Sequence, residues 1–433
     1  MDENPIQHAY CPILCGTGFP PHFTSFSPAV PAATGHAMHP HTPALTKGLT
    51  LILAICCGFS VATIYYNQAM LPLIANTFEV STAHVGQIAM LTQLGYASGL
   101  LLFVPLGDRI SRRTLILAVL CINFFALLAS ATAPSYTWLL VASVLLGLSG
   151  ISAQVIIPAA SDLSTVEQKG AVLGLMVSGL SAGGLLARTV SGVVSGWLGW
   201  RGMFAVAAAL DVLLFMAILT RMPVSISTSK LAYGALLKSL WGLARQYPTL
   251  RQSAIKGALV FGALNVFWGS MAALLALPPY GFSSAQAGLL GLSAIVGILC
   301  ASTIGQQTRR HGRLLERAGI ATVLVAFVLI YTLGLSGWWW PILIAATFLD
   351  LGNRTNQLAN QTRVLALEPS ATSRLNTVFM VVYFIGGALG SAAGAFASEH
   401  YGWQGQALTG AVFAGLALLL TLFNATTHKS TPT

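Results

Sequence analysis

The sequence has very little charge for its length. Of its 433 residues only 7% are charged and only 11 are acidic, whereas 55% are hydrophobic. Soluble domains carry about 25% charged residues, so this composition excludes an ordinary soluble protein. The apolar segments are too long and too free of alternation for the ~10-residue strands of a membrane barrel. We therefore predict an all-α polytopic membrane protein.

The patterns of several chemistries are also absent. The six cysteines form no metal or disulfide spacing, and there is no G-x-x-x-x-G-K-[ST] loop of the kind that binds ATP. The histidines near the apolar segments, His84, His311 and His400, are not clustered. A membrane enzyme would need such a cluster of reactive groups. We expect no metal, no cofactor and no enzymatic activity.

Twelve apolar segments are long enough to cross a bilayer, which takes roughly 20 helical residues. They cover residues 49–73, 85–106, 114–133, 137–160, 171–196, 202–220, 254–277, 287–305, 317–336, 338–360, 375–397 and 404–425.

Basic residues distinguish the two sides of the predicted membrane. They gather in the loops of one side, while the other side carries only Arg201. Positively charged loops stay in the cytoplasm, so both termini are predicted to be cytoplasmic. The net charge of +10 then reflects topology and indicates no nucleic-acid partner. We expect a monomer that spans the cell inner (plasma) membrane many times, with the lipid bilayer around it.

The chain also repeats itself. Trp200 aligns with Trp403 and Gln154 with Gln357, both at an offset of 203 residues. Two six-helix bundles are therefore predicted, related by a pseudo-two-fold axis as in transporters with parallel repeats. The predicted organisation is a disordered tail (1–46), an N-terminal bundle (47–221), a cytoplasmic linker with an amphipathic helix (222–253), a C-terminal bundle (254–425) and a cytoplasmic tail (426–433). Met1 and Met38 both remain possible starts.

The segment PLGDRISRR, residues 105–113, carries a family resemblance. It resembles the signature G-x-L-a-D-R-x-G-R-R of the major facilitator superfamily, with Asp108, Arg109, Arg112 and Arg113 matching. The resemblance implies a cytoplasmic gate in which Asp108 lies near the start of the span over 375–397. The alternative is that these arginines only set the topology.

Three further segments resemble one branch of this superfamily. YYNQAMLPLIA, TQLGYASGLL and GWRGMF are similar to segments of the bacterial drug and sugar exporters of the arabinose-efflux-permease type. The branch implies export coupled to protons. However, Arg188 and Thr189 replace the Gly and Pro of the antiporter signature in the fifth span, so the resemblance only suggests proton antiport.

Four ionisable residues lie within predicted spans: Arg188, Asp211, Asp350 and Arg354. Each costs roughly 3 kcal/mol on insertion scales, so each needs a partner or a wet cavity. Arg188 and Asp211 lie at matched depth in adjacent spans. Two readings stay open for Arg188: a salt bridge to Asp211, or a position facing the pore, where it attracts an anionic substrate.

The span over 338–360 carries a polar stripe. At 100° per residue, Asp350, Asn353, Arg354 and Gln357 share one face with Asn360 and Gln361. Such a face cannot contact lipid. Asp350 and Arg354, four residues apart, are able to pair, and Asp350 would stay ionised until Arg354 is drawn away. This pair is either a proton-coupling or binding element, or a static bridge.

Other polar residues are placed opposite this stripe by the repeat. Together they predict a pocket with amides and aromatic faces for a small organic molecule. They are Gln154, Tyr65, Tyr66, Asn67, Gln68, Asn265 and Trp268.

These features predict a secondary transporter of the major facilitator type that exports a small organic solute, such as a drug, sugar or metabolite, with proton coupling and by alternating access. The alternatives are an uptake symporter of a small organic anion and a sensor that has this fold but transports nothing.

Overall fold

The structure is a computed structural model that describes residues 45–427, except 166 and 225–231. The side chains of a few further residues, Asp108 among them, are not described. The predicted tail over 1–46 therefore lies almost entirely outside the described residues, as does most of the tail over 426–433. Every described residue belongs to one compact unit that begins at residue 43.

The described part of the chain is helical and contains no strand. Its α-helices are α1 (Lys47–Phe78), α2 (Thr82–Phe103), α3 (Arg112–Ala131), α4 (Tyr136–Ser149), α5 (Ser152–Asp162), α6 (Lys169–Arg221), α7 (Tyr233–Gln246), α8 (Pro248–Trp268), α9 (Met271–Leu275), α10 (Ser284–Leu289), α11 (Ala294–Leu333), α12 (Trp339–Leu365) and α13 (Thr372–Thr427). Three 3-10 turns lie between them: η1 (Pro105–Asp108), η2 (Leu290–Ser293) and η3 (Pro369–Ala371). Helices are expected because a chain in hydrocarbon must satisfy its backbone groups internally.

Three of the long helices contain a residue with non-helical backbone angles. Gly199 in α6 has φ +70° and Gly402 in α13 has φ +56°, a region that glycine enters without the steric cost of a Cβ. His311 interrupts α11 differently, with a negative φ of −127°. Gly199 and Gly402 are 203 residues apart, so the predicted repeat has a matching sharp turn in each half.

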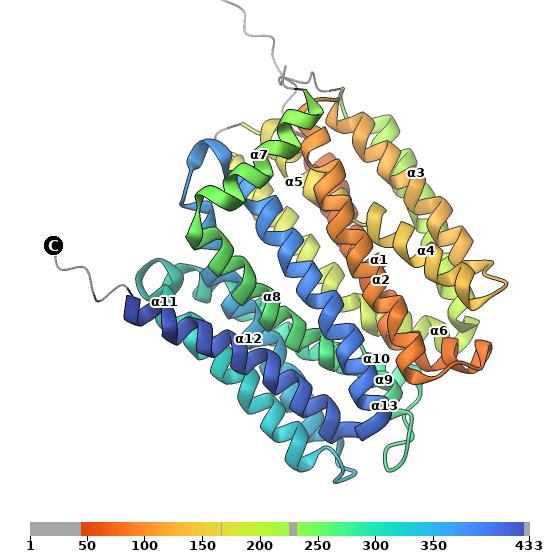
Figure 1. Cartoon of the computed structure of the whole chain (residues 1–433). Helices are drawn as coiled ribbons and strands as arrows, with labels where there is room; N and C mark the ends of the chain where they lie inside the picture. Colours follow the sequence, from red (N-terminus) through yellow and green to blue (C-terminus); the bar gives the residue numbers. More distant parts are fainter. Residues whose placement is uncertain (1–44, 166, 225–231, 428–433) are drawn as a thin grey trace, which may run out of the picture. The chain divides into compact units, whose positions relative to one another are not determined.

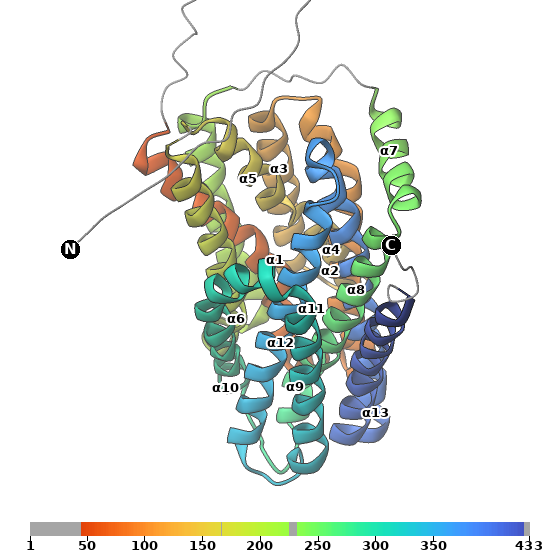
Figure 2. The ribbon, with the colours of Figure 1, turned by 90° about the vertical axis from the view of Figure 1, so that its left-hand side faces the viewer.

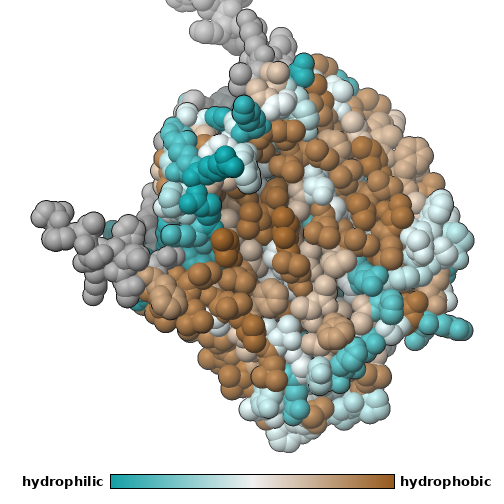
Figure 3. Space-filling view, viewed as in Figure 1, coloured by the Kyte–Doolittle hydropathy of each residue, from teal (hydrophilic) through white to brown (hydrophobic). Residues whose placement is uncertain are grey.

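The outer surface of the described helices is strongly apolar. Eight helices in this part of the chain are long and apolar enough to cross a membrane. Large apolar side chains such as Val141, Leu213 and Phe423 are 60–68% exposed. Figure 3 shows apolar side chains across most of the visible face, with hydrophilic ones gathered toward its margins. A contiguous apolar surface of this extent indicates contact with lipid.

The linker helix α7 forms where an amphipathic helix is predicted. Leu236 and Leu240 are buried, whereas Trp241 is exposed. The helix packs against α8, α13 and η1, and Tyr233 Oη donates to the Leu102 carbonyl at 2.8 Å. Figure 1 shows it running obliquely near one end of the bundle. Part of its apolar face is thus covered by protein rather than by a membrane surface.

The two halves of the chain meet along a few helices. In the C-terminal half, α8 packs on α13 and α11 on α12, as Figure 2 shows. Between the halves, α2 packs against α13, and α6 packs against α10 and η2. These contacts surround the pocket described next.

Candidate functional site: a polar pocket between the halves

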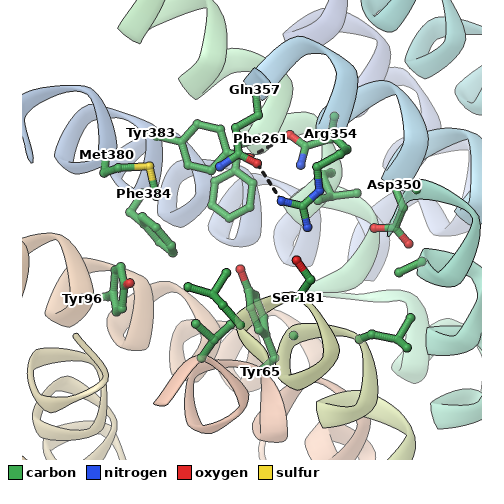
Figure 4. A pocket seen from close by; sticks show the side chains of 18 of the residues that line it. Tyr65, Tyr96, Ser181, Phe261, Asp350, Arg354, Gln357, Met380, Tyr383 and Phe384 are labelled. Carbon is green, nitrogen blue, oxygen red and sulfur yellow. Dashed lines mark hydrogen bonds between the residues drawn. The ribbon is translucent and has the colours of Figure 1, made fainter. Parts of the chain in front are cut away.

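A pocket of about 810 Å³, including its open mouth, lies between the two halves. Residues of α1, α2, α5, α6, α8, α11, α12 and α13 line it. Figure 4 shows the side chains of α12 entering it from one side and Tyr65 and Tyr96 from the other. Its lining combines apolar and aromatic side chains with a few polar ones, which is typical of sites for small organic molecules.

The polar stripe of α12 forms one wall of this pocket. Asp350, Asn353, Arg354 and Gln357 all line it, because residues three and four apart share one face of a helix. Asn360 is fully buried and bonds Asn356 of the same helix.

Asp350 and Arg354 do not form the direct pair that their spacing allows. Asp350 Oδ2 accepts a hydrogen bond from Ser293 Oγ at 3.0 Å, while Arg354 Nη1 donates to Gln357 Oε1 at 3.3 Å. Figure 4 shows the guanidinium extended into the pocket, toward the Gln357 side chain. The static intrahelical bridge is therefore wrong for this conformation.

Arg188 is held from several sides at the edge of the pocket. Its Nε donates to Gln68 Oε1 at 2.7 Å. Its guanidinium carbon lies 4.1 Å from the Trp268 ring centroid and 4.8 Å from that of Tyr65, which are cation–π distances. Only 6% of Arg188 is exposed. Packing and hydrogen bonding together fix this cation in place.

The alternative salt bridge from Arg188 to Asp211 is absent from the described residues. Asp211 is fully buried and accepts a hydrogen bond from Asn123 Nδ2 of α3 at 2.8 Å. The two residues face different helices. Arg188 faces α1 and α8, so the reading in which it lines the pore is the one the structure supports.

A network of amides joins the halves beside Arg188. Asn265 Oδ1 accepts hydrogen bonds from Gln93 Nε2 at 2.8 Å and from Gln68 Nε2 at 3.5 Å. Gln93 Nε2 also donates to Ser391 Oγ at 3.0 Å. Gln68, Asn265 and Trp268, predicted as pocket residues, thus lie behind the lining and support Arg188.

Aromatic rings form the remaining wall. Tyr96 and Phe384 have ring centroids 4.2 Å apart, and Phe261 stacks on Tyr383 at 4.0 Å. Tyr383 Oη donates to Asn353 Oδ1 at 3.0 Å. The sequence did not single out these four rings as site residues, because an aromatic in an apolar segment is equally compatible with lipid or core.

The chain matches the Major Facilitator Superfamily over residues 51–360. The chain belongs to this family.

Relatives agree with this membership, and solved structures share the fold. The chain is 35% identical over 379 residues to the uncharacterized transporter YgaY of Escherichia coli O157:H7, covering 87% of this chain and 95% of that protein. It is 31% identical over 361 residues to the probable transporter SCO4007 of Streptomyces coelicolor, with 82% of each covered. A bacterial homologue of the human lysosomal transporter Spinster shares the fold, with TM-score 0.68 and 17% identity over 87% of this chain and 95% of that one. The protein is a multi-pass membrane transporter and not an enzyme.

Of the remaining predicted site residues, one lines the pocket and two lie outside it. Gln154 lines the pocket, and its Nε2 lies 3.4 Å from Tyr96 Oη. Tyr66 instead borders an apolar groove between α1 and α6, and Asn67 Nδ2 donates to Thr92 Oγ1 at 3.0 Å. Successive residues of a helix point about 100° apart, so Tyr66 and Asn67 turn away from the face that Tyr65 presents.

The family's signature turn binds helix ends of the N-terminal half. Arg112 Nη1 forms a 2.7 Å salt bridge with Asp162 Oδ2 at the end of α5, and Arg113 Nη2 donates to the Leu219 carbonyl near the end of α6. Arg109 is exposed. The side chain of Asp108 lies outside the described part, so its predicted contact with the start of α13 stays a prediction.

The C-terminal half contains a buried ionic cluster that the sequence did not reveal. Glu316 of α11 pairs with Lys256 Nζ of α8 at 2.5 Å and with Arg363 Nη2 of α12 at 3.0 Å. Glu316 is 1% and Lys256 4% exposed. Only the fold brings together residues so distant in sequence.

Proposed function

We propose that the protein is a proton-coupled exporter of a small organic solute that works by alternating access. One observation carries this proposal: the pocket between the halves contains a carboxylate, Asp350, together with two arginines. Ionisable groups at membrane depth are costly and are typical of proton and substrate pathways. The resemblance to drug and sugar exporters supplies the direction of transport.

The helices support the twelve-span architecture proposed with this function. Two of the eight candidate spans, Lys169–Arg221 and Thr372–Phe423, are 53 and 52 residues long. Each is more than twice as long as the roughly 20 residues of one crossing and turns at a glycine. If each of these two helices crosses twice, the eight candidates supply ten crossings. The helix α12 and the stretch from α10 into α11 bring the proposed number to twelve. We propose six-helix bundles over 47–221 and 254–425, cytoplasmic termini, a plasma-membrane location and a monomer.

Close contacts at the proposed outer end support alternating access. A Cβ on Gly86 would lie 2.2 Å from the Ala395 Cβ, and the backbone N–H of Ala83 donates to the Glu399 carboxylate. Across the same end, Thr189 Oγ1 donates to the Gly288 carbonyl at 3.0 Å. Helices packed this closely leave no room for a solute, so this conformation supports an outward gate in the closed state.

Replacing Gly86 by alanine is expected to hold the outer end open. The added methyl group collides with Ala395, and overpacking of this kind costs about 1–3 kcal/mol, which is about 5- to 150-fold in the ratio of open to closed forms. The readout is labelling of Ser195→Cys by a membrane-impermeant maleimide, since Ser195 is 3% exposed in the closed form.

The matched control exchanges the two residues. In the double variant Gly86→Ala with Ala395→Gly, the colliding methyl is gone, and the next atom is the residue 395 Cα at 3.7 Å. Labelling of residue 195 should return to the parent rate. Equal labelling of the single variant and the parent would rule out this contact as part of a gate.

A second candidate function is uptake of an organic anion together with protons. It is favoured by the charge of the pocket, in which two arginines face a single carboxylate. Protonation of Asp350 would remove the charge that competes with a solute anion for these arginines. Proton and anion would then bind together and move in the same direction.

The test uses purified protein in sealed vesicles with an internal pH dye and a panel of labelled solutes. Export by antiport predicts that solute and protons cross in opposite directions, whereas uptake by symport predicts the same direction. Binding of a solute without any flux would support a sensor and overturn both transport proposals.

A further inference from the structure

We propose that the pocket binds small aromatic monoanions such as carboxylates, with Arg354 as the cation that contacts the anionic group. This inference rests on the proposed function only in treating the pocket as the substrate site. It concerns binding and leaves the direction of transport to the vesicle assay.

The charge balance of the lining is the first support. Arg188, Asp350 and Arg354 are the charged residues of the lining, which leaves a formal excess of one positive charge. The described residues contain no ion pair between Asp350 and either arginine. A buried excess charge is unfavourable unless a partner neutralises it, and an anionic solute supplies that partner.

The two arginines differ in their availability to a ligand. Arg188 is buried between the Trp268 and Tyr65 rings and bonds Gln68. Arg354 is half-buried, extends into the pocket, and donates to the neutral oxygen of Gln357 at 3.3 Å. A guanidinium binds a carboxylate with two parallel hydrogen bonds. Replacing the weak contact between Arg354 and the Gln357 amide by such a contact with a solute carboxylate is therefore favourable. Arg188 is therefore a positioning residue that raises the local positive potential.

The aromatic wall specifies the rest of the ligand. Tyr96, Phe261, Tyr383 and Phe384 lie along the pocket on the side away from Asp350 (Figure 4). Stacked and tilted rings at 4.0–4.2 Å offer apolar faces to a flat ring, and such contacts add about 0.5–1.5 kcal/mol per pair. A solute with a ring at this wall has its acid group toward α12.

A cationic solute fits this arrangement poorly. Its partner would be Asp350, whose Oδ2 accepts a hydrogen bond from Ser293, while Arg188 and Arg354 share its pocket. Repulsion from these two arginines opposes a third cation there. The pocket thus selects against positive charge.

Calorimetric titration of the full-length protein with three probes of one shape tests the inference. The probes are 2-naphthoate, neutral 2-naphthamide and cationic 2-naphthylmethylamine. We expect naphthoate to bind at least tenfold more tightly than naphthamide, and the amine to bind most weakly. Tighter binding of the amine, or no binding of naphthoate, would overturn the proposal.

Variants assign the contact to Arg354. Arg354→Gln should weaken naphthoate about tenfold and leave naphthamide unchanged, and Arg354→Lys should restore part of the loss. Asp350→Asn should tighten naphthoate, because it removes the competing negative charge. An equal loss for both probes in Arg354→Gln would show a structural role and refute the assignment. Naphthoate binding without proton movement in vesicles would overturn the proposed function but not this inference.

Discussion

Replacing Asp350 by asparagine is expected to abolish proton-driven transport. Asparagine keeps the shape of the side chain and an oxygen that accepts from Ser293 Oγ, but it cannot bind a proton near neutral pH. Because Asp350 is the carboxylate of the pocket lining, solute-dependent proton movement should fall to the level of protein-free vesicles. Exchange of labelled for unlabelled solute, which needs no net proton movement, should persist.

A second acid within the spans provides the matched control. Asp211 is fully buried and bonds Asn123 of α3 outside the pocket. Asp211→Asn should therefore retain coupling, as measured by the internal pH dye. Full proton-driven flux in Asp350→Asn, or its loss in Asp211→Asn alone, would assign coupling to a group other than Asp350.

Replacing Glu316 by glutamine is expected to destabilise the C-terminal half strongly. Glu316 is the common partner of Lys256 and Arg363, and neutralising it leaves Lys256, only 4% exposed, without its counter-charge. Removing one partner of a buried ion pair costs about 3–5 kcal/mol. Unfolding by dodecyl sulfate, followed by circular dichroism, would measure this loss.

Two further variants separate the buried charge from a general effect of losing an acid. Lys256→Met with Glu316→Met removes both buried charges and should recover most of the lost free energy of unfolding, because an apolar pair needs no counter-charge. Glu368→Gln removes an acid that bonds Tyr247 and Ser370 outside the spans and should change unfolding far less. Equal losses for Glu316→Gln and the double variant would refute the ionic explanation.

The contribution of Glu368 to the stability of the protein is expected to depend on pH, in a direction that follows from its contacts. Hydrogen bonds from Ser370 and Tyr247 hold the pKa of this carboxyl below its usual value. A folded-state pKa below the unfolded one means that the contact stabilises the protein at neutral pH and loses this effect as the pH falls through the folded value. The exposure of the group keeps this contribution small beside that of Glu316.

Local sequence predicted the helices and one wall of the pocket. The stripe of Asp350, Asn353, Arg354 and Gln357 depends only on helical periodicity, and all four residues line the pocket. The repeat placed Gln154 and Tyr65 opposite this stripe, and both line the pocket. It failed for Tyr66 and Asn67, which were grouped with Tyr65 by position in the sequence although successive helical residues point in different directions.

Pairing between side chains could not be predicted in this way. Spacing allowed Asp350 to bond Arg354, and depth allowed Arg188 to bond Asp211, yet each group has a different partner in the structure. A buried charge takes the best-placed of several polar groups, and that choice depends on which helices pack together.

Composition, basic loops, periodicity and the 203-residue repeat were sufficient to predict a helical membrane protein with two similar halves, because burial in lipid constrains every span in the same local way. The resemblance of PLGDRISRR to the family signature supplied the family. Tertiary packing decided the rest. It brought Lys256, Glu316 and Arg363 from three helices into one cluster and placed Arg188 between Trp268 and Tyr65. Apolar spans have no local sequence signal for the face that meets another helix, so the aromatic wall of the pocket emerges only when the two halves pack together.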